Sequence, residues 1–206
     1  ADVVYHVIPM NGGSVNLMRA TKDSINTAFV DLTTQMDSGP RKIMRMAQAV
    51  GAPKGPGWDN NDRIPLGTAE VSPLSQASAY ATFANDGVAV PDHVVREVRD
   101  RKGRIVYQAQ PEKQRAIDED IAHDVTYALS KVVEQGTGRA VQTLERPVAG
   151  KTGTKDRKNP DGTSDIVSAW FVAYTKQIST AVMYVAGNDG NGDLDKYARP
   201  GDSTFF

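Results

Sequence analysis

The chain has 206 residues, 39% of them hydrophobic, which suits one compact unit with its own core. Its 24 lysines and arginines face 25 acidic residues, so no strongly basic surface is available for a phosphate backbone, and we expect no nucleic-acid partner. The sequence contains no cysteine, which excludes a disulfide framework, a cysteine-ligated zinc site and a thiol nucleophile. Because no run of roughly 18 apolar residues occurs, we expect the chain to be soluble as given.

Much of the chain carries apolar residues at helical spacing, interrupted by glycine, proline and short polar stretches. Ser72-Pro73 is a typical helix start, because a serine side chain caps the first turn and proline fits within it. We predict two short helices within Leu17–Leu32 joined by a polar turn at Thr21–Ser24, and further helices over Ile43–Val50, Pro73–Ala84 and Asp118–Gln135.

Strands are predicted in two other regions, residues 88–107 and the last third of the chain. Val88–Val98 is rich in valine, and a turn at Arg101–Arg104 leads into Ile105–Tyr107, which predicts a surface hairpin. Gly187–Asp195 is dominated by glycine, aspartate and asparagine, and is predicted to be a flexible loop. The short links of the last third favour an antiparallel sheet, with strands over Val148–Thr154, Val167–Tyr174 and Ser179–Ala186.

The triplet Lys151-Thr152-Gly153 stands on the first of these strands. Beside an active serine, such a strand edge can offer an ammonium group and threonine hydroxyls to a carboxylate, while glycine lets a ligand approach the backbone. Gly150-Lys151-Thr152 also matches the end of a phosphate loop, but Glu145 occupies the position of the required first glycine, and a strand follows. A third interpretation is an exposed lysine that protects a sheet edge.

Two serine–asparagine pairs have the spacing that an acyl-transfer enzyme uses to move protons and bind a substrate amide. Ser14 and Asn16 follow a glycine-rich loop, whereas Ser24 and Asn26 lie in the polar turn between two predicted helices. Either pair can also be a simple helix cap.

Several segments together resemble class A, or bifunctional, penicillin-binding proteins, and the resemblance covers most of the chain. The stretch around Ser24-Ile25-Asn26 is similar to the family's serine-x-asparagine motif, which favours this pair over Ser14 and Asn16. Further similar segments follow in the family's order: Pro65–Asn85, Gly136-Thr137-Gly138, Ala149–Thr154 and Ala169–Thr175.

This resemblance implies an α+β fold, in which an antiparallel sheet flanked by helices lies beside a helical region, with the active site between them. It implies that a serine is acylated by the D-alanyl-D-alanine end of a stem peptide or by a β-lactam. Ser24, Asn26 and Lys151 would then be catalytic, and Thr152, Gly153 and Thr154 would bind substrate. The Thr154 N–H would form half of the oxyanion hole.

No cofactor or metal is expected. Gly187–Asp195 has Asp189, Asn191 and Asp193 at the alternating positions of a calcium loop, but Leu194 occupies the glycine position.

The sequence departs from the family pattern at the nucleophile. No serine among the 206 residues has lysine three positions later, so the Ser-x-x-Lys motif is missing and we expect no acyl-enzyme from this polypeptide alone. We expect residues 1–206 to be the C-terminal portion of one transpeptidase domain, incomplete without an upstream portion that belongs either to the same polypeptide or to a separate chain. The resemblance places the parent protein at the extracytoplasmic face of the bacterial membrane, anchored to it.

Two alternatives remain open at this stage. A D,D-carboxypeptidase or β-lactamase would use water as the acyl acceptor, although Pro65–Asn85 argues against that class. A non-catalytic module of the same fold would bind wall peptides without acyl transfer, and the missing nucleophile favours it.

Overall fold

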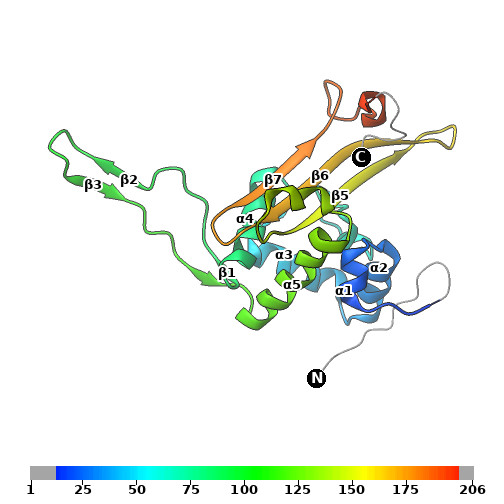
Figure 1. Cartoon of the computed structure of the whole chain (residues 1–206), viewed down its shortest axis with the longest axis horizontal. Helices are drawn as coiled ribbons and strands as arrows, with labels where there is room; N and C mark the ends of the chain where they lie inside the picture. The colour runs from blue at the N-terminus through cyan, green and yellow to red at the C-terminus, as the bar shows by residue number, and fades with distance from the viewer. Residues whose placement is uncertain (1–12, 200–206) are drawn as a thin grey trace.

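The computed structural model describes residues 13–199, in which helices pack against a three-stranded sheet (Figure 1). The sheet has the order β5-β6-β7, formed antiparallel by Ala149–Lys158, Ser164–Tyr174 and Ser179–Tyr184. The α-helices are α1 (Leu17–Lys22), α2 (Asn26–Gln35), α3 (Gly39–Val50), α4 (Pro73–Ala84) and α5 (Glu119–Gln135). Short 3-10 helices are η1 (Ile64–Leu66), η2 (Arg139–Leu144) and η3 (Leu194–Tyr197). The α+β architecture predicted from the sequence is therefore confirmed.

The helix boundaries follow the local signals in the sequence. The Ser72 hydroxyl accepts a hydrogen bond from the Ser75 N–H at 3.1 Å, and Pro73 opens α4. Helix α3 ends at Gly51, whose φ of 119° lies in the left-handed region that favours glycine. The predicted pair of short helices joined by a polar turn is present as α1 and α2. In the described part of the chain, no helix is long and apolar enough to cross a bilayer.

The core joins the helices to the sheet. Leu129 of α5, Ala149 of β5 and Tyr174 of β6 form one buried cluster, against which Tyr80 and Phe83 of α4 pack. Burial raises the pKa of Tyr80 to about 12, with a smaller contribution from the neighbouring Tyr174. A second cluster, centred on Trp58, Val50 and Ala79, connects α3 to α4. Tyr80 and Phe83 therefore help to hold α4 on the sheet, whereas Leu74, an apolar residue in the first turn of the same helix, is exposed.

Two strands of the sheet are longer than their apolar pattern indicated. The first strand was expected to end at Thr154 but continues to Lys158, and the second begins at Ser164 rather than at Val167. Polar pairs hold this extension, because Arg157 contacts Asp165 at 2.8 Å and Lys158 donates to Ser164 at 2.7 Å. Cross-strand polar contacts leave no apolar alternation in the sequence, which explains the error.

The third strand ends two residues earlier than expected. Strand β7 ends at Tyr184. Ala186 instead forms an isolated antiparallel bridge with Gly192, so the two ends of the glycine-rich segment lie side by side. This segment then leads into η3, where Leu194 is buried. The loop predicted at 187–195 therefore contains defined backbone pairing.

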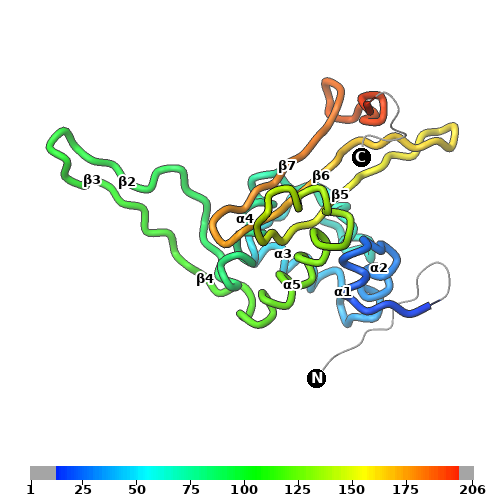
Figure 2. The backbone as a smooth tube through the Cα atoms, in the orientation of Figure 1, coloured from blue at the N-terminus to red at the C-terminus, as the bar shows by residue number. Residues whose placement is uncertain are grey.

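The predicted surface hairpin is present, but its paired part is shorter than the valine-rich run. Strand β2 (Glu97–Arg99) pairs with β3 (Ile105–Gln108), and the resulting arm projects from the body (Figure 1). At its base, β1 (Val88–Ala89, labelled in Figure 1) pairs with β4 (Gln114–Arg115, labelled in Figure 2), and the sequence did not predict this pair. Strands of two residues carry too little periodicity to be recognised from sequence.

Close contact between α1 and the end of α5 positions the turn after α1. A Cβ added to Gly136 would lie 2.3 Å from the carbonyl oxygen of Lys22 and 2.9 Å from the Cα of Val132. Only glycine fits between these two backbone segments.

We expect Gly136→Ala to destabilise the chain by about 1–3 kcal/mol, because the new methyl group must push α1 away from α5. Circular dichroism should show thermal unfolding about 3–10 °C below that of the wild type. Gly13→Ala is the matched control, since a Cβ there meets no atom within 4 Å. Equal melting temperatures for the wild type and Gly136→Ala would contradict the close packing.

Candidate active site

The turn between α1 and α2 holds Ser24 in an unusual backbone conformation. Ser24 has a φ of 56°, in the left-handed region that non-glycine residues seldom adopt. The Ile25 N–H donates to the Ala20 carbonyl at 2.9 Å, and buried Ala20 and Ala28 anchor the turn from below. Ser24 and Asn26 are both exposed, with Asn26 as the first residue of α2. The fold therefore presents this polar pair on a well-anchored turn.

Lys151 of β5 reaches across to this turn. Its Nζ donates to the Ser24 Oγ at 2.8 Å and to the Thr152 carbonyl at 3.1 Å. The side chain is half-buried, so the interpretation of Lys151 as an exposed lysine protecting a sheet edge is wrong. The structure thus joins two of the residues singled out by motif, which are 127 positions apart in the chain.

Burial lowers the pKa of Lys151 below its ordinary value. The physical cause is desolvation, since a buried ammonium loses water that its neutral form does not need. The positive charge is therefore lost at a lower pH than that of an ordinary lysine. A lysine of this kind gives up its proton more readily than an ordinary lysine.

Thr152 is held from a second side by a residue that the motif analysis did not select. The hydroxyl oxygens of Thr152 and Thr137 lie 2.7 Å apart, and the Lys151 Nζ lies 3.5 Å from the Thr152 Oγ1. Thr137 lies just after Gly136, the residue that ends α5, within Gly136-Thr137-Gly138. In the sequence these residues stand out only as a segment similar to the family, because a threonine between glycines indicates no chemistry until its neighbour is known.

The rest of the motif lies on an exposed part of β5. Strand β5 forms one edge of the three-stranded sheet, so alternate backbone groups along it are not used by β6. Thr154 is exposed and lies opposite Ala169, and Gly153 lies opposite Trp170. A Cβ on Gly153 would come within 3.3 Å of the Trp170 Cβ, so glycine keeps the strand flat against its neighbour at this point.

The competing interpretations of the motifs do not match the structure. Asn16 is a helix cap, since its Oδ1 accepts from the Arg19 N–H at 2.8 Å at the start of α1. Gly150-Lys151-Thr152 continues as strand β5, whereas a phosphate loop would lead into a helix. The turn at Ser24 therefore remains the partner of Lys151.

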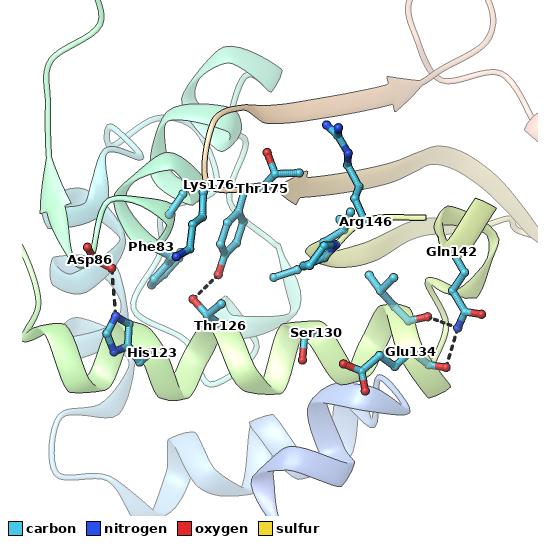
Figure 3. A pocket seen from close by; sticks show the side chains of 16 residues that line it. Phe83, Asp86, His123, Thr126, Ser130, Glu134, Gln142, Arg146, Thr175 and Lys176 are labelled. Atoms are coloured by element: carbon cyan, nitrogen blue, oxygen red, sulfur yellow. Dashed lines mark hydrogen bonds and ion pairs between the residues drawn. The ribbon is translucent and has the colours of Figure 1, made fainter. Parts of the chain in front are cut away.

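A cavity lined by described residues lies elsewhere (Figure 3). It has a volume of about 610 Å³ and lies between α5, η2 and the first residues of β5. Thr126 faces it from α5, with its hydroxyl 2.7 Å from the Tyr174 hydroxyl. None of the motif residues lines this cavity. A cavity alone does not indicate chemistry. We therefore place the site at Lys151, whose pKa is lowered and whose ammonium donates to the Ser24 hydroxyl.

Potential metal ligands also lie apart from the motif. Among residues 13–199, Asp86, Glu119 and His123 bring one ligand atom each within 4.8 Å of one another, and all three are exposed. The acceptors of the glycine-rich loop bind backbone instead, since the Asp189 Oδ1 accepts from the Asn191 N–H at 3.1 Å. Neither group includes a residue of the candidate site.

Comparison with known proteins identifies the family. The profile described as "Penicillin binding protein transpeptidase domain" matches residues 5–201. The chain belongs to this transpeptidase family. Penicillin-binding protein 1A of Aquifex aeolicus is 32% identical over 188 residues, covering 90% of this chain and 23% of that protein.

Solved structures of penicillin-binding proteins share the fold. Mycobacterium tuberculosis PonA1 has a TM-score of 0.74 at 26% identity, over 92% of this chain and 52% of that chain. Its complex with penicillin V has a TM-score of 0.72 at 28% identity, over 88% of this chain and 50% of that chain. This transpeptidase chain thus spans about half of these structures and about a quarter of the curated relative. The resemblance to class A penicillin-binding proteins is confirmed.

Titration of Lys151 tests the geometry of this site. We expect carbon-13 NMR of its Cε to give a pKa below the ordinary lysine value, because the ammonium is partly desolvated. In Ser24→Ala, the pKa should fall further, since the charged form loses the hydroxyl that accepts from it. An unchanged pKa in Ser24→Ala would show that the bond is not formed in solution.

Proposed function

We propose that this chain supplies the Ser-x-Asn and Lys-Thr-Gly parts of a peptidoglycan D,D-transpeptidase that works through an acyl-serine. The observation that carries the proposal is the hydrogen bond between Lys151 and Ser24, which brings the two motifs into one site. Membership of the transpeptidase family and the likeness to a structure titled as a complex with penicillin V support the same chemistry. A D,D-carboxypeptidase or β-lactamase would use water as the acyl acceptor at the same site residues, but the segment Pro65–Asn85 argues against that class.

Each residue of the site has a role that its position supports. Ser24, which contacts Lys151, relays a proton to the leaving group, and exposed Asn26 binds the substrate amide. Lys151 supports charge and proton transfer. Thr152 and Thr154, one strand period apart on the same face of β5, bind the carboxylate of the stem peptide or β-lactam. Gly153 leaves the edge of β5 open, and the Thr154 N–H forms half of the oxyanion hole.

The nucleophile lies outside these 206 residues in this proposal, because none of their serines is followed by lysine three positions later. The acylated serine then belongs to a Ser-x-x-Lys portion upstream of this chain, either in the same polypeptide or as a partner chain. The assembled domain acts at the extracytoplasmic face of the bacterial membrane, where stem peptides ending in D-alanyl-D-alanine are found.

Intact-mass spectrometry after incubation with excess benzylpenicillin tests this proposal. We expect no adduct on the 206-residue chain alone, because it contains no Ser-x-x-Lys. When the upstream portion is present, one penicilloyl adduct should form on that portion. A stable adduct on the isolated chain would show that it carries its own nucleophile. An assembled domain that takes no adduct while folded would instead favour a non-catalytic module that binds wall peptides.

In the assembled domain, Lys151→Ala should slow acylation by benzylpenicillin at least roughly 10²-fold, since it removes the charge and the proton relay. Stopped-flow or quenched labelling gives the rate, and circular dichroism checks that the variant folds. Lys158→Ala is the control, because this lysine lies on the same strand and bonds to Ser164 far along the hairpin. Equal labelling rates for Lys151→Ala and the wild type would refute the role.

A further inference from the structure

Thr137 lies within hydrogen-bond distance of the hydroxyl that the proposed function assigns to carboxylate binding. Its Oγ1 is 2.7 Å from the Thr152 Oγ1, and either hydroxyl can be the donor. We propose that Thr137 is a positioning residue, which holds the Thr152 hydroxyl as a donor toward the carboxylate of the stem peptide or β-lactam. This inference rests on the proposed function of Thr152.

Proton counting decides the direction of the bond once ligand is present. A hydroxyl has one proton to donate and two lone pairs that accept, whereas a carboxylate only accepts. Thr152 must therefore give its single proton to the carboxylate, which leaves Thr137 as the donor in the threonine pair. The Lys151 ammonium, which can only donate, also lies 3.5 Å from the Thr152 Oγ1. Both neighbours thus favour Thr152 as a donor toward ligand.

The backbone around Thr137 fixes the place of its hydroxyl. Gly136 is wedged against Lys22, and the Gly138 N–H donates to the Val132 carbonyl at 3.0 Å. Gly138 is buried, and a Cβ there would come within 3.3 Å of the Phe171 ring. Glycines packed on both sides prevent the short turn from shifting. Thr137 can therefore orient Thr152 before ligand arrives, so the ordering cost is not left to binding.

A positioning role predicts that Thr137 affects the binding of the carboxylate more than the rate of acylation. The Thr137 hydroxyl contacts Thr152, whereas the Lys151 ammonium contacts Ser24. Loss of the Thr137 hydroxyl leaves the Lys151–Ser24 bond intact but frees the Thr152 hydroxyl to rotate. The expected consequence is weaker capture of the carboxylate, with the limiting rate of acylation largely preserved.

The test uses the assembled domain, with saturation kinetics of acylation by benzylpenicillin and by its methyl ester. For Thr137→Val, we expect the half-saturating concentration of benzylpenicillin to rise about tenfold, the size of one charge-assisted hydrogen bond, with less than a twofold change in the limiting rate. Thr137→Ser keeps the hydroxyl and should restore the wild-type value. For the methyl ester, which lacks the negative charge, the penalty of Thr137→Val should shrink to below about twofold.

Two comparisons separate positioning from general damage. In a Thr152→Val background, Thr137→Val should cause no further loss, because its partner is already absent. Thr143→Val in η2, whose hydroxyl bonds to the Ala140 carbonyl, is the matched control and should leave both substrates unaffected. An unchanged half-saturating concentration in Thr137→Val, or equal losses for acid and ester, would overturn the inference alone. Wild-type domain that forms no adduct would overturn the proposed function, and this inference with it.

Discussion

The hydrogen bond from the Lys151 ammonium to the Ser24 hydroxyl is the interaction on which the candidate site depends. Three separate arrangements must hold before it can form. Strand β5 must lie at the sheet edge, α5 must pack on that sheet, and α1 must pack against the end of α5 so that the following turn meets the lysine. The apolar core performs this task, because it places two backbone segments that have no direct attraction for each other. The polar contact then fixes the last few ångströms.

Two features of the site lower the stability of the folded chain. Lys151 is partly desolvated, and Ser24 adopts a left-handed backbone conformation that non-glycine residues seldom show. Both cost free energy, and both bring polar groups to a defined place. The protein compensates through packing elsewhere, including the buried Ala20 and Ala28 beneath the turn.

The sequence predicted secondary structure well where a single local cause acts. Ser72-Pro73 fixed the start of α4, and Gly51 and Gly136 marked the ends of α3 and α5. The sequence failed where pairing depends on a distant partner. The extension of β5 to Lys158 rests on polar contacts across the hairpin, and β1 with β4 forms from strands of only two residues. Neither produces a pattern within its own segment.

For the site, the sequence by itself determined which residue types were available and, through the order of its motifs, the family to which they belong. Spacing alone left two serine–asparagine pairs open, the resemblance favoured Ser24 and Asn26, and no pattern pointed to Thr137. The contacts come from tertiary structure, in which Asn16 caps its own helix, Ser24 accepts from Lys151, and the Thr137 hydroxyl lies beside that of Thr152. The physical reason is that a hydrogen bond needs two partners within about 3 Å, and only the packing of α1, α5 and β5 brings residues so far apart in the chain to that distance.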